Sequence, residues 1–464
     1  VTTTTTVTGG TVTVAGGTLT GAATVGNATS GTAILTQTSG STGAVTVSDR
    51  GTLNASGGTV GAVEAAVDFS GTAADVNLTG TAVVASLDLN AGAGHVVSNN
   101  AEVTGVVTID NATLTQSGAG SKLGTDGTIA STVTVGTTGV LDVNGGMVGA
   151  IDNSGTTTID SASATSLTNT ANTSAVNAGG SVTTTTTVTG GTVTVAGGTL
   201  TGKATVNGGL LDVNSGTVGA VEVTNGAATI ASNLGGTLDV TGGMANVDGT
   251  STITGLITVD GGTITVDSGA SLTSAAGVNV GDGTGTDTFA VIGTFAGDVT
   301  LDAGGVLAVS NGFTGARLSN TGSVNNTNNG THTITLSDTY VATGVIETGT
   351  GGGVLTINSA NTIEVRGNHV VNGTGTLVLN APLVDYGVNA TLAASQASDI
   401  KVSGGSTLTV DTGADGTVVV GISPNTVTDV VIDSGSTLVI EDGETLQAGS
   451  LRNDGTLTVD AGAT

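Results

Sequence analysis

The chain has no cysteine and no tryptophan, and its 464 residues include only two prolines, two methionines, two tyrosines and four phenylalanines. Disulfides therefore play no part in its stability, and the redox state of its compartment cannot be inferred from them. A core with so few aromatic rings must be thin and filled by Val, Ile, Leu, Ala and Thr. Such a core suits narrow stacked sheets better than a thick layered domain.

Basic residues are also scarce, because seven Lys and Arg stand against 35 Asp and Glu. The formal net charge is −28 and the isoelectric point is about 4.1. An acidic surface repels phosphate backbones and anionic membranes, so we expect no nucleic-acid partner. The charge favours solubility and leaves calcium or another cation as the sharper alternative. No run of about 18 apolar residues occurs, and we expect no membrane span.

What the chain does have is glycine, at 80 residues, and many short runs of β-branched residues. With 37% hydrophobic residues, 9% charged residues and a mean hydropathy of +0.33, it is expected to fold rather than stay disordered. Runs such as Thr11–Val14, Thr263–Val266 and Thr456–Val459 alternate with period two and end at Gly, Asn, Asp or Ser. This pattern predicts short strands separated by turns, and no segment has convincing helical periodicity.

Internal repetition is the most informative feature of the sequence. The segment Val1–Gly21 recurs without a substitution at Val182–Gly202. A second pattern, G-x-L-[ND]-[AV]-[SN]-[GS]-G-[TM]-V-G-A-[VI]-[ED], begins at Gly51, Gly139 and Gly209. Copying extends a stack of units, each of which buries its apolar face against its neighbours.

The spacing between copies indicates the size of one unit. The interval from Val1 to Gly51 is longer than the equivalent interval from Val182 to Gly209. The difference is close to one coil of a β-helix, about 20 residues. Insertion of a whole coil leaves a stack intact, whereas a sandwich or barrel would not survive it.

The sequence therefore predicts an all-β fold, a parallel β-helix (β-solenoid) with a right-handed path and about 20 or more coils, forming an elongated rod. At ~4.8 Å per coil, the rod would be about 100 to 110 Å long, with two or three sides. We expect a single solenoid over residues 1–464. Its repeats are densest in 1–290, less regular with longer loops in 291–400, and regular again in 401–464. The longer loops are where specific binding is expected.

Segments such as GTLTVDAGAT, GSTLVIEDGETL and ITVDGGTITVDSGASLT resemble the passenger regions of Gram-negative autotransporters and filamentous-haemagglutinin-like adhesins. The resemblance covers nearly the whole chain and rests on composition and repeat style. It implies a right-handed β-helix exported to the outer face of the bacterial cell, acting in adhesion, aggregation or biofilm formation. Because the sequence starts and stops inside repeat-like text, we expect it to be a processed piece of a longer protein.

One segment, Asp282–Phe289, approaches the calcium-binding nonapeptide G-G-x-G-x-D-x-U-x, with Asp282 in place of the first glycine. Asp and backbone oxygens suit a hard cation. A β-roll needs tandem copies of this motif, since each ion bridges successive turns, and only one copy is present. We interpret the segment as an ordinary polar turn and keep calcium as the alternative.

Paired carboxylates, which could run glycoside cleavage, occur at Glu64 with Asp68 and at Glu441, Asp442 and Glu444. A sugar cleft also needs aromatic platforms and cationic groups, which are few here, so we expect no enzyme. A groove that collects three or more acids with an arginine within 291–400 would favour a polysaccharide-active enzyme instead.

The histidines and the threonine runs receive structural interpretations. His95, His332 and His369 are far apart in sequence and lack nearby cysteines or clustered acids, so they are expected at the surface or in loops rather than on zinc. Threonine runs such as Thr2–Thr6 and Thr183–Thr187 would suit the hydroxyl ladders of ice-binding solenoids. Their spacing drifts along the chain, however, and threonine is simply a good strand residue.

These observations predict a non-catalytic, secreted or cell-surface β-helical structural protein that acts as an adhesin stalk or as a self-associating matrix or biofilm component. Its expected partners are copies of itself or ligands on a host or surface. No catalytic, cofactor-binding or metal-ligating residue is assigned. The alternatives are a polysaccharide-active β-helix enzyme and a calcium-dependent subunit of a surface layer or filament.

Overall fold

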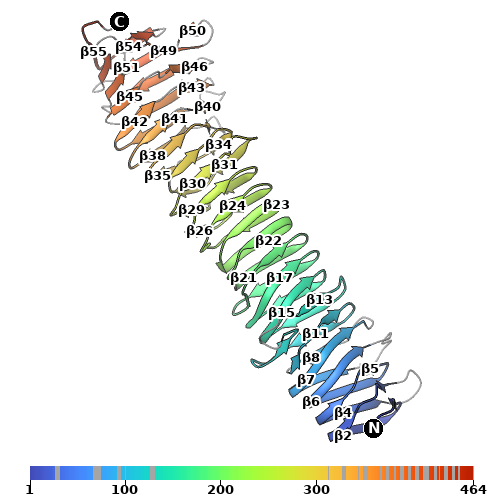
Figure 1. Cartoon of the computed structure of the whole chain (residues 1–464). Coiled ribbons are helices and arrows are strands. Elements are labelled where there is room, and N and C mark those ends of the chain that lie inside the picture. The colour runs from blue at the N-terminus through green and yellow to red at the C-terminus, as the bar shows by residue number, and fades with distance from the viewer. Residues whose placement is uncertain are drawn as a thin grey trace. The chain divides into compact units, whose positions relative to one another are not determined.

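The computed structural model is a parallel β-solenoid (Figure 1), and every element assigned in its described residues is a strand, which confirms the predicted fold class. The described residues are 1–26, 32–65, 75–90, 96–99, 101–125, 131–311, 313–326, 331–342, 344–347, 354–365, 368–372, 376–380, 383–386, 391–394, 399–402, 407–410, 417–422, 426–427, 429–432, 437–440, 445–447 and 450–462. Between residues 365 and 449, the description covers the backbone of the strands alone.

Two compact units make up the chain. The first comprises Val1–Val221 and Asn225–Thr229, and the second comprises Glu222–Thr224 and Ile230–Thr464. Within each unit, strands pair in parallel with the equivalent strands of the next coil, so the backbone hydrogen bonds run along the stack. Among the described strands, the exception is the antiparallel pairing of β49 (Thr417–Ile422) with β50 (Thr426–Val427) in the second unit.

In the first unit, a continuous ladder joins eleven strands through registered residues that begin at Thr5, Ala23 and Val45 and end at Ala204. Its strands are β1 (Thr5–Val7), β3 (Ala23–Val25), β5 (Val45–Val47), β6 (Gly51–Ala65), β7 (Asp75–Leu89), β10 (Val107–Ile109), β13 (Thr132–Val135), β15 (Gly146–Asn153), β17 (Ala162–Asn169), β20 (Thr186–Val188) and β22 (Ala204–Val218).

The second unit has an equivalent ladder of eleven strands, which runs from Leu238 to Leu457. Its strands are β24 (Leu238–Val240), β27 (Ile257–Val259), β30 (Val278–Val280), β33 (Val299–Leu301), β36 (Leu318–Asn320), β39 (Tyr340–Ala342), β42 (Thr362–Val365), β45 (Leu383–Tyr386), β48 (Thr407–Val410), β52 (Thr437–Ile440) and β55 (Thr456–Val459).

The step between registered residues varies, and bulges shift the register inside some strands, as between Ala55 and Gly57 of β6. Ile151 pairs with Leu167, whereas Leu408 pairs with Leu438, so the second step is nearly twice as long as the first. The steps scatter around the predicted length of about 20 residues per coil. Corners between strands therefore absorb the differences in length, and the strands stay aligned.

Each fully described coil of the second unit has three sides, a point that the sequence left open. β27 is followed by β28 (Thr263–Val266) and β29 (Ser271–Ser274), and these pair with β30, β31 (Asp287–Val291) and β32 (Thr294–Ala296) of the next coil. Side chains alternate between the inside and the outside of the coil, as the period of a strand requires.

The interior is a column of aliphatic side chains with very few rings. Ile264, Phe289 and Leu307 are each fully buried and occupy equivalent positions in three successive coils. The Phe289 ring meets the Phe295 ring edge to face, with centroids 5.0 Å apart, and Phe295 lies 5.8 Å from Phe313. The thin core that the composition predicts is therefore present.

Two buried asparagines occupy inward positions and form hydrogen bonds across coils. Asn153 Nδ2 donates to Asn169 Oδ1 at 2.8 Å and to the Gly155 carbonyl at 3.0 Å. Asn169 Nδ2 donates in turn to the Gly190 carbonyl at 2.7 Å. Because both asparagines are fully buried, these bonds offset the cost of removing their amides from water.

The tight corners predict a contrast between two glycines of the first unit. A Cβ at buried Gly139 would collide with the Ile109 carbonyl oxygen of the preceding coil. A Cβ at exposed Gly120 would have no atom within 4 Å. We expect Gly139→Ala to destabilise the unit by about 1 to 3 kcal/mol, the usual cost of overpacking. Gly120→Ala should be close to neutral. Urea unfolding followed by circular dichroism compares the two, and equal midpoints would contradict the expectation.

Candidate functional site

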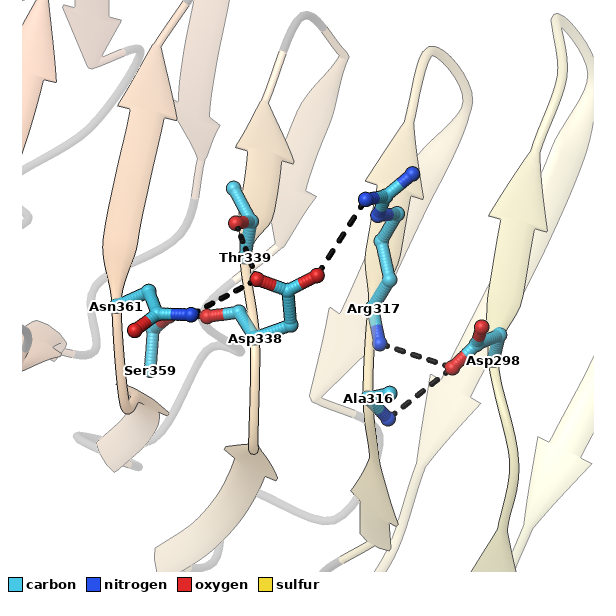
Figure 2. Close-up of polar contacts among 7 residues, drawn as sticks. All are labelled: Asp298, Ala316, Arg317, Asp338, Thr339, Ser359 and Asn361. Atoms are coloured by element: carbon cyan, nitrogen blue, oxygen red, sulfur yellow. Dashed lines mark hydrogen bonds and ion pairs between the residues drawn. The ribbon is translucent and has the colours of Figure 1, made fainter.

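The section in which we expected specific binding contains an exposed ladder of polar side chains, which we call the corner ladder: Asp298, Arg317, Asp338 and Asn361 (Figure 2). They lie where the chain enters β33, β36, β39 and β42. Parallel register aligns these four strands, so each member faces a member of the next coil.

The Asp298 end of the corner ladder holds backbone groups of the following coil. Asp298 Oδ1 accepts hydrogen bonds from the backbone N–H of Ala316 at 3.1 Å and of Arg317 at 2.9 Å. These two donors lie in an exposed turn, where a strand partner does not satisfy them. The carboxylate therefore fixes the entry into β36.

The Asp338 end joins three coils through one carboxylate. Arg317 Nη2 lies 3.4 Å from Asp338 Oδ2, and Asp338 Oδ1 accepts from Asn361 Nδ2 at 2.9 Å and from Thr339 Oγ1 at 3.1 Å. Ser359 Oγ donates to the backbone carbonyl of Asp338. The Arg317 and Asp338 side chains are 60% and 42% exposed, so the ion pair itself adds little stability.

Hydrogen bonding keeps Asp338 ionised. The bonds from Asn361 and Thr339 lower the pKa of this carboxyl below its ordinary value of 3.8, and Arg317 lowers it further. Such a group cannot serve as the proton donor of glycoside cleavage, which needs an acid with a raised pKa. The corner ladder brings together two acids and one arginine, fewer acids than the groove that would favour a polysaccharide-active enzyme.

Of the carboxylate pairs considered in the sequence, only Glu64 lies among the described residues; Asp68, Glu441, Asp442 and Glu444 lie outside them. Glu64 is exposed on β6 and stands in register with Asp88 of β7. Burial raises the pKa of Asp88, and the charges of Glu64 and Asp110 raise it further. Asp88 was not singled out from the sequence, because it is distant from Glu64 along the chain and only the register makes them neighbours.

His332 is the one histidine whose side chain is described, since His95 and the side chain of His369 lie outside the described part. It is half-buried on β38 (Thr331–Leu336), and its Nε2 has no hydrogen-bond partner. Burial lowers the pKa of this imidazole below 6.5. Among the described residues, no three or more His, Cys, Asp or Glu side chains form a group that could hold a metal ion.

The outward positions of the first ladder form what we call the threonine column. Eight of its eleven residues are threonine, although their sequence spacing drifts. In order, they are Thr6, Thr24, Thr46, Glu64, Asp88, Thr108, Thr134, Asp152, Thr168, Thr187 and Thr205. Eight strands place a threonine in the column, and Glu64, Asp88 and Asp152 interrupt it. Within a stretch of threonines, the hydroxyls of neighbouring strands lie about 4.8 Å apart.

Comparison with known proteins adds no family to these observations. No protein-family model matches the chain, and no curated protein matches its sequence. The described part of the chain also holds no helix with the length and hydropathy of a membrane-spanning segment.

The corner ladder predicts a difference between two substitutions of Asp298. Asp298→Ala removes the oxygen that accepts the N–H groups of Ala316 and Arg317, whereas Asp298→Asn keeps an acceptor at the same place. We expect the alanine variant to unfold at lower urea than the asparagine variant. Hydrogen exchange of the two amides should also accelerate in the alanine variant alone. Equal exchange rates in both variants would show that the carboxylate does not hold the turn.

His332 predicts a pH dependence of stability. Because its pKa is lower in the folded chain, the stability that it contributes is complete above pH 6.5 and is lost as the pH falls through the folded value. The difference in thermal midpoint between pH 7.5 and pH 5 should shrink in His332→Gln. Histidine NMR titration provides the direct check, since the resonance that disappears in this variant should titrate below 6.5 in the parent chain.

Proposed function

We propose that this protein is a non-catalytic, secreted or cell-surface structural β-solenoid, acting as an adhesin stalk or a self-associating matrix component of the kind found in autotransporter passengers and filamentous-haemagglutinin-like adhesins. The observation that supports the proposal best is the in-register threonine column. It gives the first unit a repetitive face on which eight of eleven outward positions carry a short hydroxyl side chain, so similar contacts can form at most of its coils.

Short hydroxyl side chains suit close contact between copies. Threonine loses little side-chain entropy when it is ordered, and its hydroxyl both donates and accepts hydrogen bonds. The threonine stretches of two identical faces can therefore pair without a specific charge pattern. The bacterial cell surface and the adhesive role come from the resemblance of the repeat text, and the fold is compatible with both.

Charge opposes this association, because each copy has a formal net charge of −28. At low ionic strength the copies repel one another over distances of about 30 Å, whereas at 0.15 M salt the repulsion is screened beyond about 8 Å. Association through the threonine column is therefore expected to strengthen as salt is added. An assembly held by ion pairs would weaken instead.

Sedimentation velocity of the purified chain in 20 mM and 500 mM NaCl tests this proposal. We expect larger species at the higher salt concentration, with fibres or sheets under negative-stain electron microscopy. A chain that stays monomeric under both conditions at about 100 µM would contradict self-association.

A matched pair of variants tests whether the copies associate through the threonine column. Thr134, Thr168 and Thr187 are changed together to Gln, which lengthens three members of the threonine column without altering the charge. The control changes Thr115, Thr158 and Thr194 to Gln on a different outward column of the same unit. The first variant should associate several-fold more weakly than the parent and the control. Equal association of both variants would place the contact elsewhere.

A further inference from the structure

One corner of the second unit is built differently from the corners above and below it. Three residues, 260–262, join β27 to β28, and three, 302–304, join β33 to β34 (Gly305–Val309). Six residues, Gly281–Thr286, join β30 to β31 in the coil between them. Asp282–Thr286 are exposed, and Gly283 and Gly285 have φ values of 87° and 82°, a conformation that favours glycine.

The residue at the end of this corner is a buried carboxylate. Asp287 is 0% exposed, and neither of its carboxylate oxygens has a hydrogen-bond partner. Its register partner in the next coil is Gly305, and the adjacent pairing of Thr263 with Thr288 places Gly262 at the same position in the preceding coil. An aspartate therefore stands where both neighbouring coils have glycine.

Further carboxylates surround Asp287 rather than basic groups. Burial raises its pKa above 3.8, and the charges of Asp282 and Asp260 raise it further. The backbone N–H groups of Asp282 and Gly261 offset part of this rise, although neither has the geometry of a full hydrogen bond with the carboxylate. Burial also raises the pKa of Asp260, and the charges of Asp282, Asp239 and Asp302 raise it further. A buried, unpaired charge in such surroundings is costly unless a positive partner offsets it.

Asp282 is held in place at the exposed side of the same corner. Its Oδ1 accepts hydrogen bonds from the Thr284 backbone N–H at 2.7 Å and from Thr284 Oγ1 at 2.6 Å. These bonds lower the pKa of Asp282, so this carboxylate stays ionised at the mouth of the corner. The other oxygen of Asp282 has neither bond.

We infer that the Gly281–Asp287 corner binds a divalent cation of the calcium class, with the carboxylates of Asp282 and Asp287 as its charged ligands and backbone carbonyls of the glycine-rich segment as neutral ones. Calcium takes six to eight oxygen ligands from carboxylates, carbonyls and water, and it tolerates irregular geometry. Two carboxylates with carbonyls and water make such a set without a third acidic ligand. Asp260 and Asp302 add negative potential beside the site.

A proton is the competing occupant of Asp287, and the two possibilities predict different behaviour. If a proton alone satisfies the carboxyl, stability falls as the pH rises above 3.8 towards the folded pKa, and calcium changes nothing. If a cation binds, the proton is released on binding, so affinity rises with pH. Asp287→Asn mimics the protonated acid and should make the cation-free chain more stable at pH 7.

The test uses the whole chain at pH 7 in 150 mM NaCl, titrated with CaCl2 in a calorimeter and melted with calcium or with EDTA. We expect one saturable site with a dissociation constant of about 10⁻⁴ to 10⁻³ M, the range of extracellular calcium modules. Calcium at ten times this constant should raise the melting midpoint of the second unit by about 3 to 6 °C.

Two variants and one control separate this site from diffuse binding to an acidic surface. Asp287→Asn and Asp282→Asn should each weaken the saturable binding at least tenfold and abolish the calcium-dependent rise in midpoint. Asp248→Asn removes one exposed acid from the same unit and should leave both unchanged. Calcium binding to the parent chain that does not saturate, or binding that is equally strong in the three variants, would overturn the assignment. If Asp287→Asn is more stable than the parent chain and calcium leaves the midpoint of the parent unchanged, the proton rather than a cation is the partner of Asp287.

Discussion

The structure depends on the register of parallel strands between successive coils. Once Thr6 is aligned with Thr24, and Thr24 with Thr46, every inward position lies over an inward position and every outward one over an outward one. A slip by one residue would turn the aliphatic column to solvent and the threonines to the interior, so register is strongly specified. The same constraint fixes the corners, where a residue such as Gly139 cannot accept a side chain because a backbone carbonyl lies against it.

Register also explains why functional neighbours are hard to recognise in this sequence. Successive members of the corner ladder are separated by a whole coil of sequence, and no local motif links them. A polar group in one coil acts on the coils above and below, as Asp298 does on Arg317 and Asp338 on Asn361. Interactions between coils are thus the unit in which a surface feature of a solenoid is built.

Much of the fold followed from the sequence, because the duplicated segments and the period-two runs report directly on coils and strands. The thin aliphatic interior followed from the shortage of aromatic residues. What could not be derived was the partner of each outward side chain, since coils of unequal length conceal the alignment. The threonine column is the clearest case: its spacing drifts in sequence, and the corners restore it in space. The Asp282–Phe289 segment was recognisable as a motif, but the burial of Asp287 and its position between Gly262 and Gly305 appear only in the structure.

The direction of the backbone hydrogen bonds has a mechanical consequence. Within a unit they point along the stack, so tension applied in that direction loads the bonds of one coil before those of the next. Such a stack yields by peeling, one turn after another, at modest force and with a large gain in length at each step. In the proposed surface role, such a stack would lengthen gradually under shear. A sandwich domain, whose strands are sheared all together, would resist until it broke.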